Sequence, residues 1–322
     1  MQKTIRFGIL GGSDFAANHM APAIHAAKGA KLAALATSSP SKAALFQAFC
    51  PDLQIMDSYE ALLATPDIDA VYIPLPNHLH VEWSLKAIAA GKHVLCEKPI
   101  ALKADEIDAL IAARDATGLL VAEAYMIVHH PQWQRAKALL EEGAIGRLMH
   151  VEGVFTYNNP TPENIRNRPE TGGGAIPDIG VYPYGATRWM TGAEPVEFTS
   201  TRIEWENNVD VVVAVGADFG SFTFQSLLSM RMANRQEMVF HGDKAVLRLG
   251  TPFNANVFDM AEVELSYPDG RRVLERFPQD NQYVHQVENY CHSIRSGAPY
   301  AWTLEQAQGT QAMIDRIYAA AR

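Results

Sequence analysis

Short apolar runs alternate with amphipathic helical stretches along residues 1–124. The strand-like runs cover residues 5–10, 31–37, 69–76, 93–99 and 119–124. The helical stretches between them cover residues 15–27, 41–49, 80–91 and 104–118. Nearly continuous apolar strands joined through helices are typical of a parallel sheet with both faces covered. The pattern therefore predicts an α/β, doubly wound Rossmann-type domain over residues 1–124.

The pattern changes after a helical stretch at residues 131–143. Residues that favour strands then cluster or alternate in runs at 147–157, 197–206, 210–219, 221–230, 245–250 and 261–277. The turn residues 268–270, Pro-Asp-Gly, divide the last run into a hairpin. Two further helical stretches follow, at 283–296 and 304–321. We predict a second α/β domain over residues 125–322, with a large, mainly antiparallel open sheet.

Length and charge exclude several classes of protein. A chain of 322 residues accommodates two domains, and its net charge of −9 comes without a cluster of Lys and Arg that would follow a phosphate backbone. No apolar run approaches the ~20 residues of a membrane span. Cys50, Cys96 and Cys291 are widely spaced and odd in number, which favours a reducing compartment. We therefore expect a cytoplasmic protein that binds neither nucleic acid nor membranes.

A glycine-bearing turn follows the first predicted strand and leads into a helix. Its residues are Gly11, Gly12, Ser13, Asp14, Phe15 and Ala16. This context is that of a loop that binds the pyrophosphate of a dinucleotide on the N–H groups of a helix start. Ser13 occupies the position where the usual fingerprint has a second glycine, so a plain N-capped helix is the alternative interpretation.

The second predicted strand ends without an acidic residue. In NAD-binding domains an Asp or Glu at this point takes the ribose hydroxyls. Here Thr37, Ser38 and Lys42 offer hydroxyl donors and a positive charge, which suit a 2′-phosphate. We predict NADP(H) as the preferred cofactor, with NAD(H) as the second choice; ordinary solvated turn residues are the alternative interpretation.

Four motifs in order resemble one oxidoreductase family. They are YIPLPNHLHVEWSLKAIAAGKHVLCEKP (72–99), EEGAIGRL (141–148), NIRNRPETGGGAIPDIGVYP (164–183) and NQYVHQVENY (281–290). Together they resemble the Gfo/Idh/MocA family, in the branch with dihydrodiol dehydrogenases, NADP-linked xylose dehydrogenases, glucose-fructose oxidoreductase and deoxysugar ketoreductases. The resemblance implies a Rossmann domain, a substrate-binding α/β domain whose open sheet forms subunit contacts, and hydride transfer with a nicotinamide cofactor. It thus implies a dehydrogenase or reductase acting on CH–OH groups, and a homodimer or higher homo-oligomer.

The resemblance assigns the catalytic residues. Lys98 lies in the EKP motif, where its charge would stabilise the alkoxide formed during hydride transfer. Tyr182 would donate or accept the proton, and it needs a neighbouring cation because a free phenol has a pKa near 10. Asp178, four residues earlier on the same predicted helix, would anchor a substrate hydroxyl or orient Lys98; a helix cap is the alternative.

The remaining site residues are carried over in the same way. Cofactor contacts are expected from the loop after the strand at 69–76 and from the EKP motif, namely Leu75, Pro76, Asn77, His80, Glu97 and Lys98. Tyr125 and Arg166 are expected to join Asp178 and Tyr182 in binding the substrate. His129 and His130 are adjacent, without the spacing of a metal site, and we predict no metal.

The leading hypothesis is an NADP(H)-dependent oxidoreductase that transfers hydride to or from a hydroxyl or carbonyl carbon of a sugar or sugar-like substrate. The lack of a Lys/Arg-rich substrate loop argues against a highly charged sugar phosphate. A trans-dihydrodiol or dicarbonyl oxidoreductase is the alternative within the enzyme class. A non-catalytic regulator that senses sugars or nucleotides is the alternative outside it.

Overall fold

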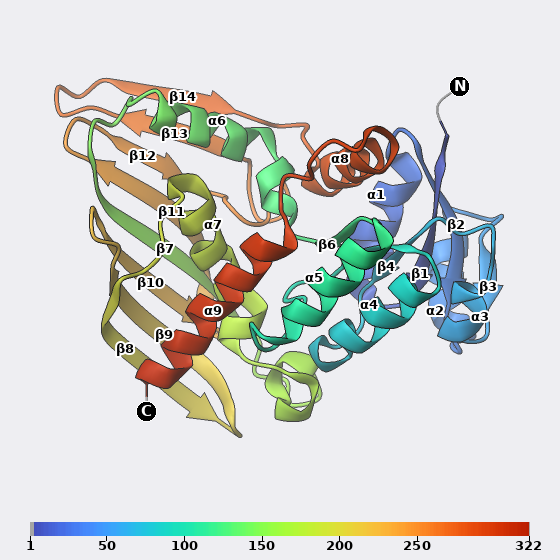
Figure 1. Cartoon of the computed structure of the whole chain (residues 1–322). Coiled ribbons are helices and arrows are strands. Elements are labelled where there is room, and N and C mark those ends of the chain that lie inside the picture. Colours follow the sequence, from blue (N-terminus) through green and yellow to red (C-terminus); the bar gives the residue numbers. More distant parts are fainter. Residues whose placement is uncertain (1–2, 322) are drawn as a thin grey trace. The chain divides into compact units, whose positions relative to one another are not determined.

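The computed structural model describes residues 3–321 and divides into two compact units, each described here by itself (Figure 1). The first comprises the chain up to His129 together with Asn281–Gln308, and the second comprises His130–Asp280 together with the residues from Gly309 onward. The predicted boundary near residue 124 treats each domain as one continuous segment, whereas each unit here draws on two. No helix within residues 3–321 is long and apolar enough to cross a membrane.

A six-stranded parallel sheet forms the centre of the first unit. Its strands are β1 (Ile5–Leu10), β2 (Ala30–Ala36), β3 (Gln54–Met56), β4 (Ala70–Ile73), β5 (His93–Cys96) and β6 (Val121–Glu123). They lie in the order β3-β2-β1-β4-β5-β6, so the chain winds outward in both directions from the pair β1 and β4. The carboxyl ends of β1 and β4 mark the edge where ligands of such sheets bind. This confirms the doubly wound fold.

Helices connect the strands and cover both faces of this sheet. They are α1 (Ala21–Ala26), α2 (Pro40–Gln47), α3 (Tyr59–Leu63), α4 (His80–Ala89), α5 (Glu106–Thr117) and α8 (Gln282–Ser296), with short helices at Ala16–Met20, Asn77–Leu79 and Met126–His129. Helices α4 and α5 pack side by side, and α8 packs beside α1 (Figure 1). Tyr290 of α8 is fully buried beside Phe7 of β1, and its hydroxyl donates to the Leu120 carbonyl. These contacts explain why α8 belongs to the first unit despite its distance in sequence.

An eight-stranded sheet forms the second unit. Its strands are β7 (Leu148–Asn158), β8 (Glu197–Glu206), β9 (Val209–Asp218), β10 (Thr223–Ser229), β11 (Arg231–Gly242), β12 (Val246–Leu249), β13 (Glu262–Ser266) and β14 (Arg272–Arg276). The order is β14-β13-β12-β11-β7-β10-β9-β8, and every pair is antiparallel except β7 with β10. The mainly antiparallel sheet is thereby confirmed.

The two faces of the second sheet differ in chemistry. One face is apolar and packs against α6 (Pro131–Glu141) and α7 (Val181–Thr191), with Val151, Met238 and Phe240 buried. Helix α9 (Leu304–Ala320) contributes its residues from Gly309 onward to this unit, and short helices lie at Ile165–Asn167, Pro169–Thr171 and Ile176–Gly180. The other face carries a row of ion pairs in which Glu237 and Glu264 join Arg235, Arg248 and Arg272 across strands β11 to β14.

Two strands were not predicted from the sequence. Strand β3 has only three residues and lies at the edge of its sheet, with Gln54 exposed and the other two residues half-buried. Strand β11 begins with Arg231, Met232, Ala233, Asn234 and Arg235, a largely polar run that lacks strand-like alternation. The second half of the strand, from Gln236, alternates buried residues and is held in the sheet by pairing with β7 on one side and β12 on the other.

Candidate active site

The glycine turn after β1 closes tightly against the sheet. Gly11 and Gly12 are buried, and the Gly11 amide donates to the Ala36 carbonyl at the end of β2. Ser13 Oγ accepts a hydrogen bond from the Ala16 amide at 3.1 Å, so its side chain caps the helix that follows. A hydroxyl that accepts in this way keeps its own proton for a phosphate oxygen. Asp14 is exposed to solvent.

Lys42 lies beside this turn. An idealised Cβ on Gly12 would stand 3.2 Å from Lys42 Cβ and 3.6 Å from Lys42 Cδ, so the lysine side chain packs directly along the glycine. Thr37 follows β2, and its Oγ1 accepts the Ser39 amide at 3.2 Å. The structure therefore brings Lys42, predicted to bind a 2′-phosphate, beside the turn predicted to bind the pyrophosphate, and Thr37 follows the Ala36 carbonyl that Gly11 contacts.

The loop after β4 reaches the glycine turn through Leu75. An idealised Cβ on Gly11 would lie 2.9 Å from Leu75 Cδ2, so these two predicted cofactor residues are neighbours. Asn77 begins a short helix and is half-buried. His80 is 1% exposed, and its Nδ1 and Nε2 each lie 2.7 Å from a carbonyl oxygen, those of Pro99 and Leu75. Burial lowers the pKa of His80, although both carbonyls favour its protonated form. Both nitrogens thus face backbone carbonyls of two loops, and the contact of His80 with the cofactor stays a prediction.

Two carboxylates, those of half-buried Glu97 and buried Glu123, hold the backbone around Lys98. The Tyr72 hydroxyl donates to Glu97 Oε1 at 2.6 Å, and the Lys98 amide donates to Glu97 Oε2 at 3.2 Å. On the other side, the Ile100 amide donates to Glu123 Oε1 at 2.9 Å. Burial raises the pKa of Glu123 to about 6. Lys98 itself is half-buried at the carboxyl edge of the parallel sheet.

Tyr125 lies in the core of the first unit. It is 0% exposed and stacks on Trp302 with ring centroids 4.0 Å apart. The Trp302 indole N–H donates to Glu123 Oε2 at 2.9 Å, which fixes the stacking partner. Tyr125 is thus buried against Trp302, and its contact with the substrate stays a prediction.

Tyr182 lies in the first turn of α7 against aromatic rings of the second unit. The residue is 5% exposed, and its ring packs 5.7 Å from Phe155 and 5.4 Å from Phe253. These rings restrict the Tyr182 side chain to one direction. Gly153 allows α7 to approach the sheet closely, since an idealised Cβ there would lie 2.6 Å from Pro183 Cβ.

Asp178 joins two other polar side chains near Tyr182. Its Oδ2 accepts from the Tyr157 hydroxyl at 2.6 Å, and its Oδ1 lies 2.9 Å from Arg166 Nε. The charge of Asp178 raises the pKa of Arg166, and the nearby phenol of Tyr182 shifts that pKa in the same direction. Burial and the same carboxylate raise the pKa of Tyr157. The structure thus brings the predicted residues Arg166, Asp178 and Tyr182 together and adds Tyr157.

Asp210 holds the start of the helical segment that carries Asp178 and Tyr182. It is 1% exposed, and its carboxylate accepts from the Ile176 amide at 2.7 Å and from the Tyr318 hydroxyl at 2.8 Å. Gly174 has φ +137°, and a Cβ there would stand 2.1 Å from Asp210 Oδ1. Only glycine fits at that position.

His129 and His130 have separate structural partners. His129 Nδ1 lies 3.0 Å from the Asn289 side-chain nitrogen, and burial lowers the pKa of His129 to about 3. His130 Nδ1 accepts the Gln132 amide and so caps α6. Among residues 3–321, no group of three His, Cys, Asp or Glu side chains is arranged to hold a metal ion.

Family models match both halves of the chain. A model described as an oxidoreductase family with an NAD-binding Rossmann fold matches residues 5–125, and one for the GFO/IDH/MocA C-terminal domain matches residues 133–248. The chain belongs to the Gfo/Idh/MocA oxidoreductase family. The glycine turn, the EKP segment and the Tyr182 helix are therefore parts of a Gfo/Idh/MocA oxidoreductase.

Individual relatives extend over nearly the whole chain. A dTDP-3,4-didehydro-2,6-dideoxy-α-D-glucose 3-reductase from Actinomadura kijaniata is 32% identical over 99% of this chain and 96% of its own length. An NADP(+)-dependent D-xylose 1-dehydrogenase from Haloferax volcanii is 32% identical over 98% of this chain and 97% of its own. A 3-ketoreductase from A. kijaniata, solved with NADP and TDP-benzene, has a TM-score of 0.91, with 30% identity over 99% of this chain and 98% of its own. Variants of that ketoreductase with Tyr replaced by Phe, or Lys by Ala or Glu, have also been solved with these ligands.

Several residues around the site escaped sequence reasoning. Tyr157 follows Phe155 by two positions on β7, so the alternation along a strand places both side chains on one face. This spacing could have predicted that Tyr157 lies near the site. Asp210 is the second residue of β9 and precedes a mostly apolar run, and a buried acid at such a place indicates a specific partner. Phe253 lies outside any regular helix or strand and had no periodic signal.

Proposed function

We propose that this protein is an NADP(H)-dependent oxidoreductase that interconverts a carbonyl and a hydroxyl group on a sugar ring. The observation that carries the proposal is the arrangement around Tyr182, whose phenol lies among Phe155, Phe253 and the Arg166–Asp178 pair. A phenol held by rings beside a guanidinium is equipped to release and regain a proton. Membership of the family supplies the reaction class.

The first unit has residues that fit the cofactor. The buried Gly11–Gly12 turn and the helix capped by Ser13 suit the pyrophosphate, while Thr37, Ser38 and Lys42 suit a 2′-phosphate. Leu75, Pro76 and Asn77 would lie along the nicotinamide side, with the Phe15–Ala16 backbone at the helix start. NADP(H), when bound, supplies or accepts the hydride. NAD(H) would bind more weakly, because it gives Lys42 no phosphate to contact.

The proton step is assigned to Tyr182 with Lys98. In the reducing direction the Tyr182 hydroxyl donates its proton to the substrate oxygen, and the charge of Lys98 stabilises that oxygen as negative charge develops. Arg166 favours the resulting phenolate, and Asp178 with Tyr157 keeps Arg166 in place. In the oxidising direction the same phenolate takes the proton from the substrate hydroxyl.

The site and the relatives support a proposal for the substrate class. Arg166 is 40% exposed, so a part of its side chain remains accessible to a polar substrate. The relatives include reductases of dTDP-linked ketosugars and NADP-linked dehydrogenases of xylose. We propose a sugar ring, free or linked to a nucleoside diphosphate, and not a dihydrodiol.

A tyrosine pair in one helix tests the assignment. Tyr182→Phe removes only the hydroxyl, so we expect kcat to fall by about 10²- to 10⁴-fold while the Kd for NADPH stays unchanged. Tyr184→Phe is the matched control, because Tyr184 is 0% exposed and faces Phe224 of the sheet. Equal turnover of the wild type and Tyr182→Phe would remove Tyr182 from the mechanism.

A substrate panel tests the sugar class. NADPH oxidation is followed at 340 nm with a dTDP-3-ketosugar and a dicarbonyl, and NADP+ reduction with xylose, glucose and a trans-dihydrodiol. We expect kcat/KM to be highest for one of the sugars. A dihydrodiol or dicarbonyl preference would refute the substrate class, and tight NADPH binding without any turnover would favour a sensor.

The ion-paired face of the second sheet is proposed to join copies of the chain into a homodimer or larger homo-oligomer. The face carries Arg248 between Glu237 and Glu264, and the strand register places Val239 and the exposed Leu274 on the same face. Replacing Arg248 with Glu would place three carboxylates together and should shift the mass measured by light scattering toward the monomer. An unchanged mass would place the contact elsewhere.

A further inference from the structure

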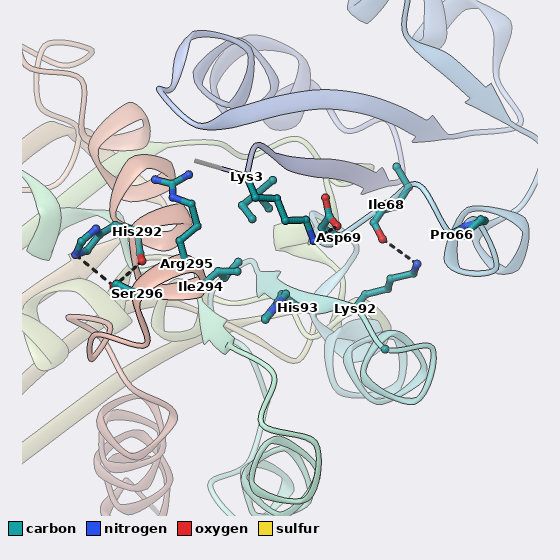
Figure 2. A pocket seen from close by; sticks show the side chains of 12 residues that line it. Lys3, Pro66, Ile68, Asp69, Lys92, His93, His292, Ile294, Arg295 and Ser296 are labelled. Atoms are coloured by element: carbon teal, nitrogen blue, oxygen red, sulfur yellow. Dashed lines mark hydrogen bonds and ion pairs between the residues drawn. The ribbon is translucent and has the colours of Figure 1, made fainter. Parts of the chain in front are cut away.

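A cavity of about 700 Å³ lies at the amino-terminal edge of the parallel sheet (Figure 2). The starts of β1, β4 and β5 form one side, and the last turn of α8 forms the other. Figure 2 shows Arg295 and Ser296 on α8 across from the strand starts that carry Lys3, Asp69 and His93. The cavity is therefore built entirely from residues of the first unit.

This cavity is separate from the residues assigned to the cofactor. It borders Ile5, the first residue of β1, whereas the glycine turn follows Leu10, the last one. A six-residue strand places these ends roughly 17–20 Å apart. All strands of the sheet are parallel. His93, at the start of β5, and Lys98, just after its end, therefore lie at opposite edges of the sheet.

The charge of the lining is positive. Lys3, Lys92 and Arg295 line the cavity, and Asp69 is the one carboxylate among its lining residues. Asp69 already accepts from the Arg6 backbone and guanidinium and pairs with Lys3 at 2.9 Å. Lys92 Nζ donates to the Thr65 and Ile68 carbonyls at 2.7 and 2.8 Å. Asp69 is balanced mainly by Arg6, so Arg295 and the largely exposed Lys3 are the cations left to face an anion.

Two further groups supply directed donors. The Leu120 amide donates to His93 Nδ1 at 2.8 Å, so the neutral ring carries its proton on Nε2. Arg295 Nη1 donates to the Gly29 carbonyl at 3.2 Å, and an idealised Cβ on Gly29 would collide with that nitrogen. Arg295 Nε is buried, with no hydrogen-bond partner among the described residues. A buried donor without a partner costs free energy unless a ligand or water satisfies it.

Apolar side chains complete the lining. Ile294 borders the cavity beside Arg295, while Ile68 and Pro66 lie toward its other end, beyond Asp69 (Figure 2). An inorganic anion would leave this surface and most of the volume without contacts. A ligand with both an anionic group and a compact ring would use the two kinds of surface together.

We propose that this cavity is a second ligand site, separate from the redox site, that binds a phosphomonoester carrying a compact ring. The phosphate dianion is recognised by Arg295, Lys3 and His93, and the ring packs on Ile294 beside Arg295. A dianion is favoured over a carboxylate because the lining carries two positive charges more than it carries negative ones.

The test measures binding of phenyl phosphate to the protein saturated with NADP+, so that the phosphate sites of the cofactor are occupied. Isothermal titration calorimetry at pH 7.5 should give a Kd in the millimolar range or tighter. Benzoate has the ring with a single charge, inorganic phosphate has the charge without the ring, and each should bind at least tenfold more weakly. Equal affinity for phenyl phosphate and benzoate, or for phenyl phosphate and inorganic phosphate, would overturn the proposed ligand class.

Substitutions assign the binding to this cavity. Arg295→Gln should weaken phenyl phosphate binding at least tenfold, and Lys3→Gln, at a side chain 70% exposed that the fold does not require, about threefold. Arg271→Gln is the matched control, because that arginine is 71% exposed and pairs with Asp269 in the second unit. Unchanged affinity in both Arg295→Gln and Lys3→Gln would overturn the site, whatever the affinity of the wild type.

Discussion

Asp210 allows a quantitative prediction about pH and stability. Its carboxyl is 1% exposed between the Ile176 amide and the Tyr318 hydroxyl. Burial raises its pKa from 3.8 to about 7, against the opposing effect of these hydrogen bonds. The perturbation is Asp210→Asn, which keeps an oxygen for the Ile176 amide and presents N–H to a tyrosine oxygen that can accept.

The sign and size follow from linkage. Because the folded pKa lies above the unfolded one, the stability linked to Asp210 is fully present below about pH 4 and is lost as the pH rises through 7. A shift of about 3 units corresponds to ~4 kcal/mol in total. Between pH 5 and 8 the wild type should therefore lose ~2–3 kcal/mol relative to Asp210→Asn.

The assay is urea unfolding of both proteins at pH 5, 6, 7 and 8, compared as midpoint shifts at constant m. Asp69→Asn is the control. Burial alone would raise the pKa of Asp69, but hydrogen bonds from Arg6 and Lys3 outweigh it and lower the pKa, so stability is lost only as the pH falls through that lowered value. Its stability difference from the wild type should stay constant from pH 5 to 8. A difference for Asp210→Asn that is equally constant would refute the reasoning.

Three other substitutions address the site. Lys42→Glu should raise the KM for NADPH at least tenfold and leave that for NADH unchanged, whereas Lys103→Glu, an exposed control in the same unit, should change neither; equal effects on both cofactors would contradict the 2′-phosphate assignment. Ser13→Gly should cost only a few tenths of a kcal/mol in stability and weaken NADPH binding roughly tenfold in a fluorescence titration; tighter binding would mean that the side chain crowds the phosphate. Tyr157→Phe should lower kcat about tenfold with unchanged NADPH affinity and move the pH–rate profile, because Asp178 loses a donor; an unmoved profile would restrict Tyr157 to packing.

The sequence predicted the elements whose signal is local. Strands such as β1 and β4 are continuous apolar runs, and the glycine turn follows β1 directly, so both could be placed without tertiary information. β11 could not, because its first residues are polar and irregular: between Arg231 and Arg235 only these two end residues pair, both with β7.

Side-chain roles were harder to predict than positions. His80 and Tyr125 lie in the motifs that indicated them. Both nitrogens of His80 nevertheless face carbonyl oxygens, and the ring of Tyr125 stacks on Trp302. Trp302 lies far along the chain from Tyr125, and no local pattern links them. Asp210 and Tyr318 come together for the same reason, through folding of segments that are remote in sequence.

The discontinuous first unit has a consequence for synthesis of the chain. Residues up to His129 leave the ribosome first, but Tyr290, which packs beside Phe7, follows only after the whole of His130–Asp280 has been made. At about 5–20 residues per second, that interval lasts roughly 8–30 s. During it the nascent Rossmann sheet lacks α8, so the surface that Tyr290 will cover is open to chaperones.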